Sequence, residues 1–210
     1  MERELKRPSR LQDHTKAVVI LHGRSELLVA KHIKQNLRLP IELYSRDKGY
    51  QNIQITSLIT ILTNTIFKTI CCFLKTYDKI SSNGRGSNKQ LNDFRLFTIM
   101  DTDDCSKKQK QDYIDKTMFK GKWFYDYICP VYNSQSLDCI MEEIGYAKKG
   151  EIEKTGKTKW YETIFPNKVG YTKQDIEAFR DKLKKCKNTN MDEFVSYCLE
   201  YTKDFSKRQQ

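Results

Sequence analysis

The sequence of 210 residues predicts an α/β fold, in which an open parallel sheet carries helices on both faces and a helical extension follows at the C-terminus. Short apolar runs, typical of strands buried on both faces, alternate with segments of helical periodicity. The final part of the chain contains two amphipathic helices and no such run. We expect a polar N-terminal tail over 1–14, the α/β domain over 15–145 and the helical extension over 146–210.

The first elements form a strand, turn and helix. The continuous apolar run at 17–21 predicts a buried strand, and a glycine turn then leads into a helix over 25–37. We expect Ser25 to cap this helix. The residues at 41–45 alternate in polarity and predict a second strand.

The middle of the chain predicts a long helix and a third strand. Apolar residues recur at helical spacing over 53–77, which predicts one core-facing helix. The segment 81–90 is rich in Gly, Ser and Asn and predicts a flexible loop. A strand over 95–100 and a lysine-rich helix over 106–119 follow.

The remaining elements include a fourth strand over 127–132 and a short helix over 137–144. The segment 147–168 is rich in Lys, Glu and Gly and predicts no definite element. Capping patterns and apolar stripes predict two closing helices, over 172–186 and 190–205.

The charge of the chain points to polyanionic partners. Its 38 Lys and Arg residues exceed its 27 Asp and Glu residues, which gives a net charge of +11. Nucleic acid is the first candidate partner, and an anionic membrane surface is the second. The alternative explanation is a lysine-rich composition that has no functional meaning. Because no run of about 18 apolar residues occurs, an integral membrane protein is excluded.

The seven cysteines form no CxxC pair, and no closely spaced histidines accompany them, so we expect no zinc site. The N-terminal MERELKRPSR has no apolar core and therefore does not resemble a signal peptide. Reduced thiols and the lack of an export signal predict a cytoplasmic location.

Charged residues follow the first and third predicted strands, which end in HGRSE and DTDDC. Ligands of open parallel sheets bind beyond the carboxyl ends of the strands. Asp101 and Asp103 are two residues apart, so their carboxylates can point to one side and suit Mg²⁺ or Mn²⁺. The alternative is a solvated turn in which Asp104 or Ser106 caps the next helix.

Glu26 is the acidic residue after the first strand. We expect it in the first turn of the helix that follows Gly23. Taken alone, it could simply compensate the helix dipole, which is common at helix N-termini. Together with the later DxD, it indicates a two-part acidic site.

This arrangement resembles the Toprim domain of topoisomerases, DnaG-type primases and the RloB and OLD-like defence nucleases. The Toprim pattern is an apolar strand ending in Glu-Gly, often an acidic residue soon after it, and a later strand ending in DxD. Here the segments 18–26 and 96–104 carry the resemblance, which covers about residues 15–145. The spacing Gly-x-Ser-Glu and the segment 130–145 look most like the RloB and OLD-like branch.

The resemblance implies a Toprim-like sheet and a nuclease that depends on Mg²⁺ or Mn²⁺. Asp101, Asp103, Asp104 and Glu26 would be the metal ligands, and Glu26 would also serve as a catalytic acid or base. The substrate would be DNA or tRNA and the role anti-phage defence. An ABC-type, SMC-like ATPase would be the controlling partner, and association with further copies of this chain stays open.

His22 is the departure from the family pattern, because it stands where the family has its catalytic Glu. A histidine there can act as a general base or metal ligand. It can equally mark an inactivated site, which makes a nucleic-acid or partner binding module the alternative function. The cations expected to hold the phosphates of a nucleic acid, or else to form a solvated face, are Arg24, Arg46, Lys48, Lys107 and Lys108.

Overall fold

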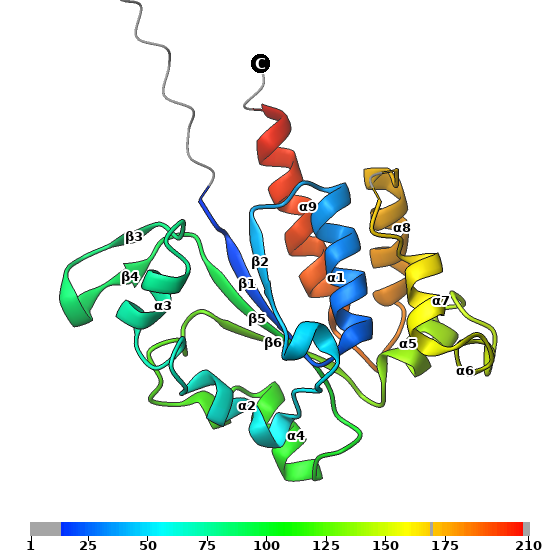
Figure 1. Ribbon diagram of the computed structural model, residues 1–210, viewed down its shortest axis with the longest axis horizontal. Coiled ribbons are helices and arrows are strands. Elements are labelled where there is room, and N and C mark those ends of the chain that lie inside the picture. Colours follow the sequence, from blue (N-terminus) through cyan, green and yellow to red (C-terminus); the bar gives the residue numbers. More distant parts are fainter. Residues whose placement is uncertain (1–13, 169, 208–210) are drawn as a thin grey trace, which may run out of the picture.

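The computed structural model describes residues 14–168 and 170–207, and its centre is a four-stranded parallel sheet (Figure 1). The strand order is β2-β1-β5-β6, with bounds Ile41–Tyr44, Ala17–Leu21, Arg95–Asp101 and Ile128–Asn133. Ala17 is in register with both Ile41 and Arg95, and Asp101 with Asn133. The predicted α/β class with a parallel sheet is confirmed.

The central strand β1 divides the core into two layers. All five of its side chains are inaccessible to solvent, as its uniformly apolar sequence predicts. Alternate side chains of a strand point to opposite faces. Val18 and Ile20 therefore join the core on one face, whereas Ala17, Val19 and Leu21 join the core on the other.

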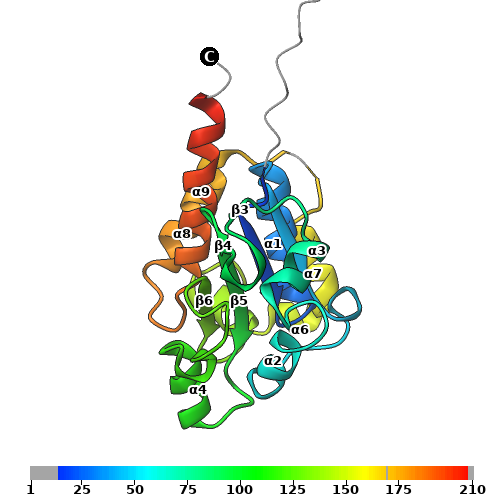
Figure 2. The same cartoon turned by 90° about the vertical axis from the view of Figure 1, so that its left-hand side faces the viewer.

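Helices cover both faces of the sheet (Figures 1 and 2). One face carries α1 (Arg24–Asn36), α5 (Leu137–Glu143), α6 (Glu151–Thr155), α7 (Lys157–Ile164), α8 (Lys173–Leu183) and α9 (Met191–Lys207). The other face carries α2 (Ile55–Leu62), α3 (Ile70–Thr76) and α4 (Lys107–Ile114). None of these helices, within the residues that the structure describes, is long and apolar enough to cross a membrane.

The single helix predicted over 53–77 is wrong, because this segment forms two helices, α2 and α3. The polar residues between them compete for backbone hydrogen bonds. The Thr63 hydroxyl donates to the Ile59 carbonyl, and the Asn64 side chain accepts from the Thr65 amide. Thr69 then caps α3 by accepting from the Cys72 amide.

Two other predicted segments are corrected in detail. The predicted flexible loop at 81–90 contains a short antiparallel pair, β3 (Ser82–Asn83) and β4 (Gln90–Leu91). The predicted helix at 106–119 ends early, because Lys116 adopts a left-handed backbone (φ 62°) and a 3₁₀ turn over Thr117–Phe119 follows. Between 147 and 168, where no element was predicted, the chain forms α6 and α7.

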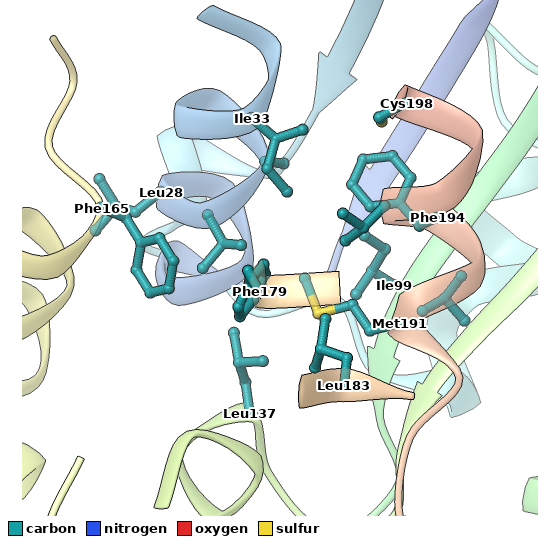
Figure 3. Close-up of a cluster of buried hydrophobic side chains, with 14 of the residues drawn as sticks. Leu28, Ile33, Ile99, Leu137, Phe165, Phe179, Leu183, Met191, Phe194 and Cys198 are labelled. Carbon is teal, nitrogen blue, oxygen red and sulfur yellow. The ribbon is translucent and has the colours of Figure 1, made fainter. Parts of the chain in front are cut away.

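The C-terminal helices pack against the sheet. Figure 3 shows Phe179, Met191 and Phe194 in one apolar cluster with Ile33 and Ile99. The side chain of Asn190 accepts from the Tyr132 amide and donates to the Pro130 carbonyl, which covers the outer edge of β6. The predicted extension therefore shares a core with the predicted α/β domain. Of the predicted N-terminal tail, residues 1–13 lie outside the described residues.

Candidate active site

The ends of β1 and β5 bring the two predicted motifs together. The His22 amide donates to the Ile99 carbonyl at 2.9 Å, which continues the pairing of these strands by one residue. The Thr102 amide donates to the Asn133 carbonyl at 3.0 Å and holds the end of β5 against β6. His22, Asp101 and Asn133 consequently lie side by side at the carboxyl edge of the sheet.

Glu26 is turned back toward this edge by the start of α1. Its Oε2 accepts a hydrogen bond from the Gly23 amide at 3.0 Å, and Gly23 is the N-cap residue. The prediction that Ser25 caps the helix is wrong, because α1 starts one residue earlier and Ser25 lies inside its first turn. A side chain at Gly23 would collide with Asn52, since its Cβ would lie 2.7 Å from Asn52 Oδ1.

Asp101 and His22 are held by neighbouring groups. Asp101 Oδ1 accepts from the side-chain amide of Asn133 at 2.9 Å, and Asn133 in turn accepts from the Thr189 hydroxyl. His22 Nδ1 lies 2.9 Å from the Ile53 carbonyl oxygen. Because a carbonyl can only accept, Nδ1 carries a proton, and Nε2 faces Asp101 Oδ2 at 4.0 Å.

The two carboxylates form a buried acidic pair. Glu26 is 1% exposed and Asp101 is 4% exposed. Burial, followed by the charge of Glu26, raises the pKa of Asp101 to about 7. Burial also raises the pKa of Glu26. Two carboxylates in such surroundings resist simultaneous ionisation unless a cation joins them.

One oxygen atom of this acidic pair is free to bind a cation. Glu26 Oε1 is buried and has no hydrogen-bond partner among the residues described. Carboxylate oxygens suit Mg²⁺ and Mn²⁺, so the donor set of Glu26 and Asp101 fits these ions. As the side chains stand, no group of three or more His, Cys, Asp or Glu within residues 14–168 and 170–207 is arranged to hold a metal ion.

Asp103 and Asp104 lie in the exposed turn after β5. They do not cap the next helix, because Ser106 does so, with Gln109 completing a capping box. The part of the alternative interpretation that assigned the cap to Ser106 is therefore correct. The structure brings Asp101 beside Glu26 and His22, whereas Asp103 and Asp104 lie at the surface.

Helix α7 adds a cation that the sequence did not reveal. The Lys157 ammonium pairs with Asp138 at 2.9 Å, and the Tyr161 hydroxyl donates to the same carboxylate at 2.8 Å. Partial burial lowers the pKa of Lys157, but Asp138, and then Glu26 and Asp101, raise it overall. Only a lysine-rich run marks this segment in the sequence, and such a run does not single out one lysine.

The predicted phosphate-binding residues divide into two groups. Arg24 contacts Glu162 at 3.1 Å and the Lys48 carbonyl at 3.3 Å, and it belongs to a cavity at the start of α1. Arg46 and Lys48 are exposed on the loop after β2. The exposed Lys107 and Lys108 lie on α4, which covers the other face of the sheet, and Lys108 pairs with Asp112.

Comparison of the chain with protein-family models, with curated proteins and with solved structures gave no match in any of the three. The function of the chain must therefore be inferred from the residues at the sheet edge. Those residues are a buried acidic pair, an oriented histidine and a neighbouring lysine.

Proposed function

We propose that the chain is a nuclease that uses Mg²⁺ or Mn²⁺ to hydrolyse phosphodiester bonds of DNA or tRNA. The observation that carries the proposal is the buried pair of Glu26 and Asp101, in which one glutamate oxygen has no hydrogen-bond partner among the described residues. Unpaired carboxylates are costly to bury, so sites of this kind are commonly functional.

In this proposal Glu26 and Asp101 would hold the ion, and Asp103 and Asp104 would supply further ligands from the exposed turn after β5. The bound ion would polarise the scissile phosphate and lower the pKa of water. His22 then acts through Nε2, since the Ile53 carbonyl occupies Nδ1, and a neutral Nε2 can accept the proton of attacking water.

The positive charges support a phosphate-bearing substrate. Lys157 is close enough to the acidic pair to alter its pKa values, so its ammonium can offset charge on a phosphate there. The net charge of +11 favours a polyanion in general. The residues proposed to hold its backbone are Arg24, Arg46, Lys48, Lys107 and Lys108.

The biological setting rests on the resemblance to the RloB and OLD-like nucleases. It supports a role in anti-phage defence, in the cytoplasm, under the control of an ABC-type, SMC-like ATPase. A second copy of the chain is a further proposed partner.

His22 favours a second candidate function, because it stands where the Toprim pattern has Glu. A chain that had lost catalysis at this position would be a nucleic-acid or partner binding module. The two functions differ in a single measurable property, which is the cleavage of phosphodiester bonds.

Incubation with plasmid DNA and total tRNA, in Mg²⁺, Mn²⁺ or EDTA, separates these functions. We expect cleavage with either metal, none in EDTA and none by Asp101→Asn. Asp126→Asn is the matched control, because Asp126 is exposed and precedes β6 at the opposite edge of the sheet. Cleavage in EDTA, or undiminished cleavage by Asp101→Asn, would contradict the nuclease proposal, and absence of cleavage by the wild type would favour the binding module.

A further inference from the structure

A cavity of about 260 Å³ opens beside the acidic pair. Its walls are the first turn of α1, the loop after β2 and the start of α7, which lies beside that turn in Figure 1. Glu26 and His22 line this cavity, together with Arg24, Ser25, Gly49, Tyr50 and Lys157.

The loop after β2 has an unusual backbone conformation that brings it into close contact with the start of α1. Asp47, Lys48 and Gly49 all adopt positive φ angles, of 43°, 52° and 90°. A Cβ at Gly49 would lie 2.8 Å from the Arg24 Cα, so only glycine permits this close approach. Left-handed backbone at two non-glycine residues is costly and tends to occur at functional sites.

This loop presents an aromatic ring at the mouth of the cavity. Tyr50 is 68% exposed, the highest exposure of any large hydrophobic residue in the described part of the chain. The Arg24 guanidinium lies 5.2 Å from the centre of its ring. An exposed ring that is supported by an arginine resembles the platforms on which unpaired bases stack.

The inner part of the cavity is rich in hydrogen-bond donors. The Ser25 hydroxyl and Arg24 Nε are buried and have no partner among the residues that the structure describes, and Ser25 is only 2% exposed. Both lie in the first turn of the 13-residue helix α1, where the helix dipole favours an anion. Lys157 adds a positive charge from the facing wall.

We propose that this cavity binds one unpaired nucleotide, with its phosphate at the first turn of α1 and its base on Tyr50. The inference rests on the proposed function and deepens it by naming the substrate class. The nuclease would act on single-stranded or looped nucleic acid, because a base paired within a duplex cannot turn onto Tyr50. DNA and RNA both offer this chemistry.

Fluorescence anisotropy in EDTA tests the proposal without any cleavage. The probes are labelled strands of about 20 nucleotides, as DNA and as RNA, and the DNA duplex of the same sequence. We expect the wild type to bind a single strand more tightly than the duplex. Tyr50→Ala should weaken single-strand binding about tenfold and leave duplex binding unchanged, whereas Tyr50→Phe should bind like the wild type.

Tyr171→Ala, at a second exposed aromatic residue, is the matched control and should bind like the wild type. Ser25→Ala should weaken binding of the single strand whether or not Tyr50 is present, and thermal unfolding confirms that each variant folds. If Tyr50→Ala weakens binding of only one of the two single strands, DNA or RNA, that nucleic acid is identified as the natural substrate.

The proposal is overturned if Tyr50→Ala has no effect, if it weakens duplex and single strand equally, or if no probe binds. Its failure is distinct from that of the nuclease proposal, because binding is measured without metal. If the chain binds single strands through Tyr50 but never cuts them, the nucleotide-binding proposal is supported and the nuclease proposal is contradicted.

Discussion

Replacing Asp101 by asparagine should stabilise the metal-free protein while it removes a proposed metal ligand. In the folded chain the pKa of Asp101 is raised from 3.8 to about 7, chiefly by burial and then by Glu26. Asparagine has a similar shape, keeps an oxygen for the hydrogen bond from Asn133 and carries no charge. The substitution therefore removes the cost of ionising a buried acid.

The size of the effect follows from the shift in pKa. About three pKa units, at roughly 1.4 kcal/mol each, set an upper limit of about 4 kcal/mol above pH 7. Part of the shift arises from the charge of Glu26, so not all of this energy belongs to Asp101 alone. We therefore expect Asp101→Asn to raise the free energy of unfolding by about 2–4 kcal/mol. For a chain of this length, at roughly 2–4 °C per kcal/mol, that corresponds to a rise in Tm of roughly 4–16 °C.

The sign of the pH dependence is fixed by the direction of the shift. Between pH 4 and 7 the folded wild type keeps a proton on Asp101 that the unfolded chain has released, so its free energy of unfolding falls as the pH rises. The advantage of Asp101→Asn should grow over this window and level off above pH 7.

Thermal unfolding in EDTA, from pH 4 to 8, measures the stability of the wild type and of Asp101→Asn. Adding Mg²⁺ at pH 8 should raise the Tm of the wild type and leave that of Asp101→Asn unchanged, because the ion stabilises the state that binds it. A variant that is less stable than the wild type at pH 8 in EDTA, or a pH-independent difference, would refute the reasoning.

Three further predictions concern catalysis, binding and the closing helices. In single-turnover cleavage, Glu26→Gln should be inactive and His22→Ala about ten- to hundredfold slower; the reverse ranking would exchange their roles. Log affinity for nucleic acid should fall linearly with log salt, and charge reversal at Arg46 and Lys48 should weaken binding with an unchanged circular dichroism spectrum; a flat salt response would leave these cations as solvated surface. Truncation after Gly170 should give an insoluble chain, because it removes several buried apolar side chains worth about 1.5–3 kcal/mol each; a soluble, folded product would contradict the packing of α8 and α9.

The strands and the acidic pair could be predicted because each has a local signal. The uniformly apolar run of β1 indicates burial on both faces, and the residues after β1 and β5 meet because neighbouring parallel strands end at one edge. The sequence thus predicts that Glu26 and Asp101 lie close together at this edge, as they do in the structure, and their role as metal ligands stays a prediction.

Other features depend on contacts between distant segments. Lys157 influences the pKa values of the acidic pair only because α7 packs beside α1, and nothing in the sequence distinguishes it from the other lysines of its run. Tyr50 stands at the cavity mouth because Gly49 allows the loop to approach Arg24. The break between α2 and α3 depends on the hydrogen bonds of Thr63, which helical periodicity does not reveal.

Binding of Mn²⁺ at pH 8, followed by electron paramagnetic resonance, tests most directly whether the buried pair is a metal centre, because it requires no knowledge of the substrate. The wild type and Asp126→Asn should bind the ion with equal affinity. Asp101→Asn and Glu26→Gln should each bind it at least about tenfold more weakly, since each lacks one of two charged oxygen ligands. Equal Mn²⁺ affinity in all four proteins would contradict the account.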